Sequence, residues 1–117
     1  MTTKITRNVI VFAALLLSAA GAQAASVLTA KNGMTLYVFD KDKGGIPSCY
    51  GFCADFWPPY IGIKGEKMNK RWTLLKRTNG KMQWAYNGRP VYFYSIDKKP
   101  GDIAGDGKEG VWHAIKG

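Results

Sequence analysis

The residue types that most often carry chemistry are scarce in this sequence, and three of them could form one site. Cys49 and Cys53 are separated by three residues, and His113 is the only histidine. In an oxidising compartment two cysteines tend to pair as a disulfide. Two thiolates and an imidazole would alternatively bind copper(I) or zinc. We predict a Cys49–Cys53 disulfide, and a copper-binding or redox site of Cys49, Cys53 and His113 is the alternative.

Common catalytic motifs are not visible. The sequence has no Gly-x-Ser-x-Gly, His-Glu-x-x-His or phosphate-loop motif, and no Cys-x-x-Cys pair. Acidic residues between positions 97 and 109 lie among glycines and could bind calcium. However, their spacing is not that of an EF-hand loop, and three lysines lie among them. We expect a turn-rich loop there, no enzymatic activity and no cofactor.

One stretch carries most of the positive charge. Between positions 64 and 81 a single acid, Glu66, accompanies seven basic residues: Lys64, Lys67, Lys70, Arg71, Lys76, Arg77 and Lys81. Such a segment favours anionic partners such as lipid headgroups, lipopolysaccharide or acidic glycans, and nucleic acid is not expected. The structural alternative is an edge strand whose lysines prevent aggregation. The residues assigned to an anionic partner are Lys70, Arg71, Lys76 and Arg77.

One pattern occurs twice, 55 positions apart. Residues 33–42 read GMTLYVFDKD and residues 88–97 read GRPVYFYSID, so both contain Tyr-x-aromatic-x-x-Asp. The same offset relates Trp57 to Trp112, well outside the pattern. Agreement at such distant positions predicts a duplicated unit. The motif residues are Tyr37, Phe39, Asp42, Tyr92, Tyr94 and Asp97.

The motif can be interpreted physically as a buried strand with a corner. Successive residues of a strand face opposite sides, so Tyr37 and Phe39 share one face, and the apolar residues beside them occupy the other. The aspartate follows where the strand should end. It could accept N–H groups of the next turn, or the tyrosine hydroxyl of the other unit. We expect packing to explain the repeat, and a ligand or cation site across a pseudo-twofold axis is the alternative.

The elements that hold these residues are predicted to be strands. Asn-Gly pairs at 32–33, 79–80 and 87–88 predict hairpins with type I′ turns, which need positive φ at both central residues. Strand-like runs surround them, at residues 26–31, 34–40, 71–78, 81–86, 90–95 and 111–115. The three runs between 71 and 95 predict an antiparallel meander. Residues 54–60 contain two prolines and allow at most one helical turn.

Together these elements predict an all-β fold: a small antiparallel-sheet domain with hairpin turns and long loops rich in glycine and proline. It consists of two pseudo-repeats, at about residues 27–81 and 82–117. Residues 1–24 have the features of a secretory signal peptide, since a basic start precedes an apolar run and Ala22-Gln23-Ala24. That run is shorter than the ~20 residues of a membrane span. We therefore expect cleavage near Ala24 and a single domain, residues 25–117, without a transmembrane segment.

The chain resembles a bacterial family described as a secreted repeat of unknown function, with members predicted to be lipoproteins that carry a Tyr-x-aromatic-x-x-Asp motif. The matching segments are Tyr37–Asp42, Tyr92–Asp97, CYGFCADFWPP at 49–59 and PGDIAGDGKEGVW at 100–112. The resemblance implies a secreted or envelope location and no established activity. No cysteine directly follows the expected cleavage site, so we expect a soluble protein rather than a lipid-anchored one.

Function is predicted here from location and charge. We expect an exported binding or structural module of the cell envelope, periplasmic or secreted, whose basic segment meets an anionic partner. The alternative, from a different class, is a periplasmic copper-binding or redox protein that uses Cys49, Cys53 and His113.

Overall fold

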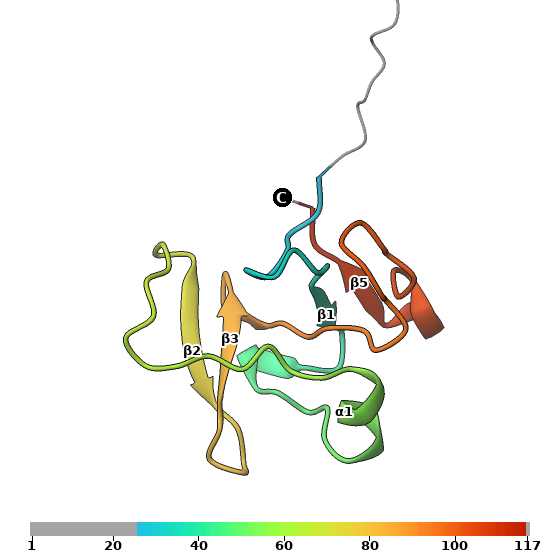
Figure 1. Ribbon diagram of the computed structural model, residues 1–117. Coiled ribbons are helices and arrows are strands. Elements are labelled where there is room, and N and C mark those ends of the chain that lie inside the picture. Colours follow the sequence, from blue (N-terminus) through green and yellow to red (C-terminus); the bar gives the residue numbers. More distant parts are fainter. Residues whose placement is uncertain (1–25, 117) are drawn as a thin grey trace, which may run out of the picture.

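Short strands and long connecting segments make up the structure, a computed structural model that describes residues 26–116 (Figure 1). The predicted signal peptide lies outside the described residues. In chain order the elements are β1 (Tyr37–Phe39), η3 (Lys43–Gly45), α1 (Phe52–Phe56), β2 (Trp72–Lys76), β3 (Met82–Tyr86), β4 (Arg89–Pro90), η4 (Lys108–Gly110) and β5 (Trp112–Ala114), with η for a 3-10 turn. The all-β prediction is confirmed, with α1 as a short helix before the two prolines.

The strands form two small antiparallel sheets. β2, β3 and β4 make the expected meander in that order, while β1 pairs with β5. The second sheet joins distant parts of the chain and places Val38 opposite His113. All six predicted strands are shorter than expected, and two of them differ most. The third strand of the meander ends at Pro90, and residues 26–31 form only isolated bridges.

The chain after Pro90 is bonded on both sides rather than along one ladder. Tyr92 forms isolated bridges with Tyr37 on one side and with Pro59 on the other. Pro58 and Pro59 have no N–H groups to donate, so a regular ladder cannot form along them. The predicted strand at 90–95 is therefore replaced by an extended segment held at single points.

The three Asn-Gly turns are present, but two are of a different type from that predicted. All three glycines have positive φ, whereas Asn87 alone among the asparagines does, with a φ of 50°. In the hairpins at 30–34 and 77–81 the glycine N–H donates to the residue three positions earlier, at 2.9 Å. These are type I turns followed by a left-handed glycine. The type I′ prediction is wrong there because each asparagine side chain instead accepts the N–H two residues later.

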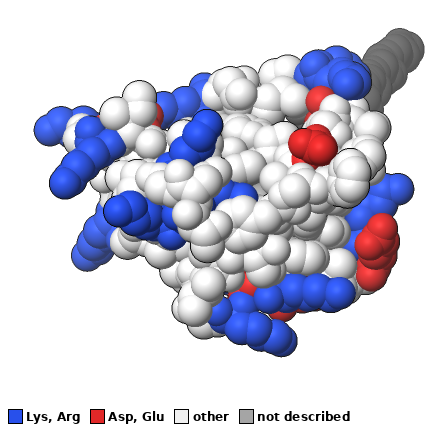
Figure 2. Space-filling view, turned by 90° about the horizontal axis from the view of Figure 1, so that it is seen from below, with Lys and Arg blue, Asp and Glu red and all other residues white. Residues whose placement is uncertain are grey.

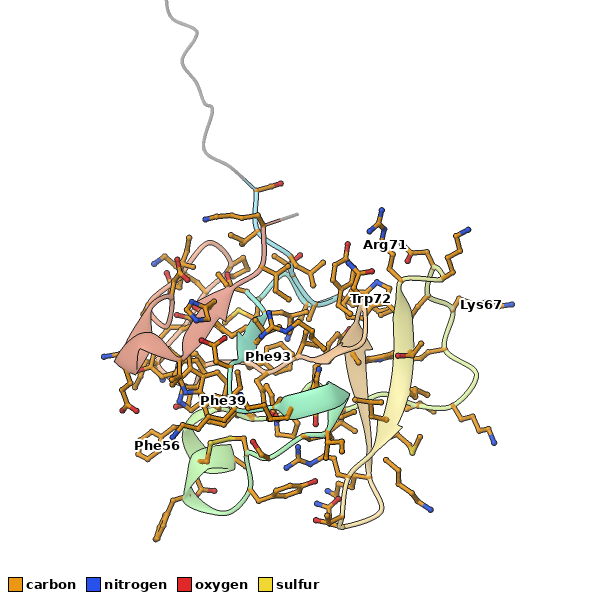
Figure 3. The ribbon with its side chains drawn as sticks, turned by 180° about the vertical axis from the view of Figure 1, so that it is seen from behind. Phe39, Phe56, Lys67, Arg71, Trp72 and Phe93 are labelled. Atoms are coloured by element: carbon orange, nitrogen blue, oxygen red, sulfur yellow. A yellow bond between two sulfur atoms is a disulfide. The ribbon has the colours of Figure 1, made fainter. Side chains whose placement is uncertain are left out.

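Two hydrophobic clusters lie on opposite faces of β1 and of the segment 91–95. One cluster contains Ala30, Leu36, Val38, Tyr60, Trp84 and Val91. The other contains Tyr37, Cys49, Trp57, Tyr92 and Trp112. Figure 3 shows Trp72 and Phe93, which pack against the first cluster, and Phe39, which packs against the second. The predicted alternation of the motif residues thus separates two cores.

Candidate functional site

The two copies of the motif meet at their tyrosines. Tyr37 N donates to Tyr92 O at 2.8 Å, and Tyr92 N donates to Tyr37 O at 2.9 Å. These residues are equivalent in the repeat, so a pseudo-twofold axis passes between them. Each copy is therefore completed by contacts with the other.

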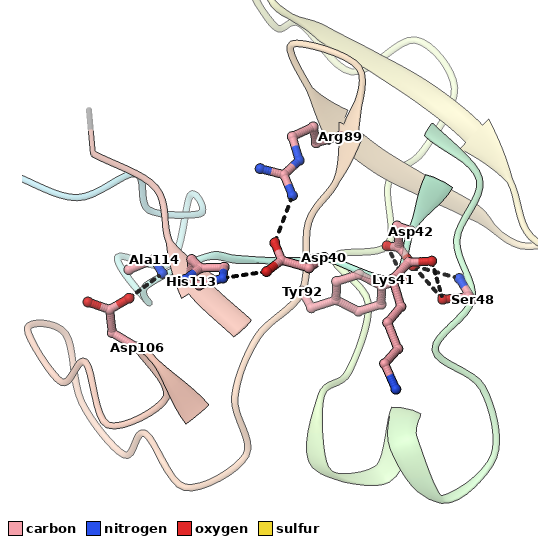
Figure 4. A network of polar contacts seen from close by, with 9 residues as sticks. All are labelled: Asp40, Lys41, Asp42, Ser48, Arg89, Tyr92, Asp106, His113 and Ala114. Atoms are coloured by element: carbon pink, nitrogen blue, oxygen red, sulfur yellow. Dashed lines mark hydrogen bonds and ion pairs between the residues drawn. The ribbon is translucent and has the colours of Figure 1, made fainter. Parts of the chain in front are cut away.

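The side chains repeat this exchange. The Tyr37 hydroxyl donates to Asp97 Oδ2 at 2.7 Å, and the Tyr92 hydroxyl donates to Asp42 Oδ2 at 2.8 Å. Each aspartate thus binds the tyrosine of the other copy. Figure 4 shows one half of this arrangement, with Asp42 between Tyr92 and Ser48.

The second oxygen of each aspartate fixes the loop that follows it. Asp42 Oδ1 accepts the N–H of Ser48 at 2.8 Å and its hydroxyl at 2.7 Å. Asp97 Oδ1 accepts the N–H of Ala104 at 2.9 Å. From the sequence, each aspartate was expected to accept either N–H groups of the next turn or the tyrosine hydroxyl of the other copy. In the structure it does both, with one carboxylate oxygen for each.

The protonation of the tyrosines suits this role. Burial raises the pKa of the Tyr37 phenol above its usual range, and the hydrogen bond to Asp97 raises it further. Burial also raises the pKa of Tyr92, followed by the negative charge of Asp42. Both phenols stay protonated at physiological pH and act as donors.

Four aromatic rings stack in the order Phe39, Trp112, Trp57, Tyr94, an arrangement we call the aromatic column. Successive centroids are 4.1, 3.9 and 4.1 Å apart, and the two indoles are parallel to within 1°. Phe39 of the first copy stacks on Trp112 of the second, and Tyr94 of the second copy stacks on Trp57 of the first. Such stacks stabilise a fold beyond the area they bury.

All six motif side chains make contacts within the protein, although Phe39, Asp42 and Tyr94 are partly exposed. Tyr37 and Tyr92 are fully buried, and Asp97 is 7 % exposed. Within residues 26–116 no group of three or more His, Cys, Asp or Glu side chains is arranged to hold a metal ion. The geometry favours packing and loop anchoring over a ligand or cation site at the motif.

Cys49 and Cys53 form the predicted disulfide, with an S–S distance of 2.07 Å. As a disulfide the two sulfurs are not thiolate ligands for a metal. His113 Nε2 instead lies 2.7 Å from Asp40 Oδ2. The structure thus does not bring Cys49, Cys53 and His113 together as the alternative metal site.

Asp40 is a polar centre that the sequence did not reveal. It pairs with His113 through one oxygen and with Arg89 through the other, at 3.5 Å (Figure 4). The hydrogen bond with His113, more than the nearby Arg89, lowers the pKa of the Asp40 carboxyl. These residues come from three distant segments, so only the pairing of β1 with β5 could have pointed to the site.

The acidic loop is anchored in the same way as the motif. Asp102 Oδ2 accepts the N–H groups of Lys98 and Lys99 at 2.8 and 3.1 Å. Asp106 Oδ1 accepts the N–H of Ala114 at 2.9 Å. The bond from Lys98 N–H, with those from Lys99, lowers the pKa of Asp102. These carboxylates therefore stabilise the turn-rich loop that the sequence predicted.

The basic segment is exposed at all but one of its basic residues. The exposed ones, which we call the basic edge, are Lys64, Lys67, Lys70, Arg71, Lys76 and Lys81. None of them forms an ion pair within the described chain. Figure 3 shows Lys67 and Arg71 pointing away from the sheet beside β2, which is an edge strand of the meander.

The assignment of Arg77 to an exposed binding surface is wrong, because its side chain is only 3 % exposed. Its Nη1 donates to Gln83 Oε1 and its Nη2 to Cys49 O, both at 2.7 Å. The guanidinium carbon lies 4.1 Å from the centre of the Tyr50 ring. A planar guanidinium can satisfy two buried acceptors and stack on a ring at once, which explains a buried arginine here.

Comparison with known proteins identifies the family. A family described as a secreted repeat of unknown function matches residues 22–60 and 73–116, well over half of the chain. The chain belongs to this family. Each matched region contains one copy of the Tyr-x-aromatic-x-x-Asp motif, so the resemblance seen in the sequence is confirmed. No curated protein and no solved structure matches the chain.

The family description supplies a location and no activity. Membership supports a secreted protein. In residues 26–116 no helix is long and apolar enough to cross a membrane. Cleavage near Ala24, a periplasmic destination, the single domain at 25–117 and the repeat boundaries near residues 81 and 82 stay predictions.

Proposed function

We propose that this secreted protein is a binding module rather than an enzyme, and that it docks on an anionic component of the cell envelope through the basic edge. The observation that carries the proposal is the set of six exposed cations without an ion pair in the described chain. Such a cluster creates a positive potential that attracts phosphate-rich or carboxylate-rich surfaces. Lipid headgroups, lipopolysaccharide and acidic glycans all have this chemistry.

The one acid of the segment does not neutralise the basic edge. Glu66 Oε2 pairs with Lys31 Nζ at 3.1 Å. Its Oε1 accepts the N–H of Ile63 at 2.9 Å and the indole N–H of Trp84 at 3.2 Å. Glu66 therefore serves the fold, and the six cations keep their charge available.

The same contrast extends over the molecule. Six of the eight acidic side chains accept hydrogen bonds within the protein: Asp40, Asp42, Glu66, Asp97, Asp102 and Asp106. Among the described residues, by contrast, most Lys and Arg side chains donate no hydrogen bond within the protein; the exceptions are Lys31, Arg77, Arg89, Lys98 and Lys99. Figure 2 accordingly shows many Lys and Arg side chains projecting from the face it presents, with few acidic groups among them.

Protection of the sheet edge is the competing explanation. Lysines on an edge strand oppose pairing with other chains. Only Lys76 lies within β2, and the other five cations lie in the loops beside it. Loops need no such protection, so edge protection accounts for one residue of six.

The proposal predicts salt-sensitive retention of the protein on heparin and on vesicles rich in phosphatidylglycerol. Lys67→Glu with Arg71→Glu should weaken binding at least about tenfold, since each basic residue near an anionic surface contributes about 1 kcal/mol. Retention should fall as salt rises, because exposed charges are screened beyond about 10 Å at 0.1 M. Elution position and vesicle co-sedimentation measure both effects.

The matched control is Lys43→Glu with Lys116→Glu, two exposed lysines outside the basic edge. It changes the net charge by the same amount and should keep most of the binding. Equal losses in the two double variants would show that net charge alone acts, and the proposed surface would be wrong.

A further inference from the structure

An open groove of about 600 Å³ lies beside the aromatic column, between β1, α1, η4 and β5. Six of the eleven residues that line it are aromatic: Phe39, Phe52, Phe56, Trp57, Tyr94 and Trp112. Figure 3 shows Phe39 and Phe56 close together at this side of the molecule. The volume is in the range of pockets that hold a small organic ligand.

The rings of α1 are exposed although they are large and apolar. Phe52 is 86 % exposed and Phe56 is 55 % exposed. They are four residues apart on α1, so they project on the same side of the helix. The disulfide ties Cys53 of this short helix to Cys49, a link that involves neither phenylalanine. Their presence at the groove is therefore not explained by the fold alone.

The aromatic column supplies ring faces as well as edges. Trp57 and Trp112 are covered on both faces by their neighbours, and they are 8 % and 3 % exposed. Phe39 and Tyr94 end the column, so each has one face without a stacked ring, and each is partly exposed. Flat apolar ligands pack well against such surfaces.

Charged side chains stand at the same groove. Lys41 and Lys108 line it and are exposed, and the ammonium group of neither forms a hydrogen bond or ion pair in the described chain. Glu109 also lines it, with a left-handed φ of 52° that is uncommon for glutamate. Residues held in such conformations often occur at functional sites. Two ammonium groups against one carboxylate favour an anion.

We propose that this groove binds a small amphipathic anion: a ligand with a flat, apolar ring body and a carboxylate, sulfonate or phosphate group. The ring body would pack between the α1 phenylalanines and Phe39, the end of the aromatic column that lies close to Phe56 in Figure 3. The anionic group would pair with Lys41 or Lys108. This site is separate from the basic edge and does not depend on it.

Two fluorescent probes that differ in charge test the proposal. Anilinonaphthalene sulfonate is an aromatic anion, and N-phenylnaphthylamine has similar rings without the sulfonate. The folded protein should bind the anionic probe at one saturable site and more tightly than the neutral probe. Lys41→Gln with Lys108→Gln should weaken the anionic probe at least about fivefold and leave the neutral one unchanged. Phe52→Ser with Phe56→Ser should weaken both about tenfold or more.

Matched controls use exposed residues elsewhere on the protein. Ile46 and Ile63 are 69 % and 71 % exposed and do not line the groove, so their serine variants should bind as the wild type does. Lys43→Gln with Lys116→Gln is the control for charge. Thermal melting of every variant separates loss of a site from loss of the fold.

Three results would overturn the proposal. One is the absence of saturable binding by the folded wild type, and another is equal loss in the groove and control variants. The third is loss of vesicle binding in the Phe52 and Phe56 variant, which would make α1 a lipid contact. Variants of the basic edge should leave probe binding unchanged, so failure here and failure of the envelope-binding proposal remain distinguishable.

Discussion

Each aspartate of the repeated motif holds two segments at once. Asp97 fixes its own loop through Ala104 and the other copy of the motif through Tyr37. Tyr37 also accepts the N–H of Gly105 at 3.2 Å, so one buried phenol joins three parts of the chain. A buried hydroxyl that loses its partner costs more than the bond itself contributed. Single substitutions of Tyr37 or Asp97 should therefore lower the stability of the fold.

We expect Asp97→Asn and Tyr37→Phe each to lower the free energy of unfolding by about 1–2 kcal/mol. Because the two groups bond to each other, the double variant should lose about 1 kcal/mol less than the sum. Chemical denaturation of the four proteins gives this coupling energy.

The control for this cycle pairs residues that do not bond. Tyr37→Phe with Asp42→Asn joins two residues of one copy, and the hydroxyl of Tyr37 binds Asp97 rather than Asp42. Its losses should add. Coupling in this control as large as in the bonded pair would contradict the crossed arrangement.

At the scale of elements, the hairpins show how one dipeptide serves two turns. Asn87-Gly88 has positive φ at both residues. Asn79-Gly80 has it at glycine alone, while Asn79 Oδ1 accepts the N–H of Lys81 at 3.0 Å. Asn87 contributes a residue that tolerates positive φ, whereas Asn79 contributes a side-chain hydrogen bond. Replacing each asparagine by glycine separates these two roles, because glycine keeps the backbone freedom and loses the side chain.

Asn87→Gly should change the free energy of unfolding by no more than about 0.5 kcal/mol. Glycine adopts positive φ without strain, and this gain offsets the greater conformational entropy that glycine gives to the unfolded chain. Asn79→Gly should cost about 1 kcal/mol or more, because it loses a hydrogen bond and gains no relief. Thermal melts of the two variants compare them directly. A stable Asn79→Gly protein would mean that both turns are of type I′.

The elements also show what could be foreseen from sequence. Asn-Gly pairs and alternating apolar residues are local signals, and they correctly predicted antiparallel hairpins and the two buried faces. The shortness of the strands depends on which segments lie beside them. The contacts of Asp40 and the burial of Arg77 depend on residues from distant segments of the chain, for which local spacing holds no signal.

For the whole molecule, the use of its ionisable groups sets the range of pH over which it is stable. Asp40, Glu66 and Asp102 have lowered pKa values in the folded protein. The unfolded chain therefore takes up protons first as pH falls, and stability is lost in acid. Tyr37 and Tyr92 have raised pKa values, so the unfolded chain loses protons first in alkali.

We expect the denaturation midpoint to be nearly constant between about pH 5 and 9. It should fall below about pH 4, near the ordinary carboxyl values, and above about pH 10, the ordinary value for tyrosine. Absorbance of the phenolate form should show two tyrosines that ionise only when the protein unfolds. Free ionisation of all six tyrosines in the folded protein would refute the buried pair.

The exchange of contacts between the two copies affects the order in which the protein can fold. A chain is synthesised from its N-terminal end. Trp57 must wait until Trp112 has been made, 55 residues later, before the indoles can stack. Closing so long a loop is slow compared with forming a local hairpin. The first copy therefore cannot complete its aromatic stack until the second copy has been synthesised.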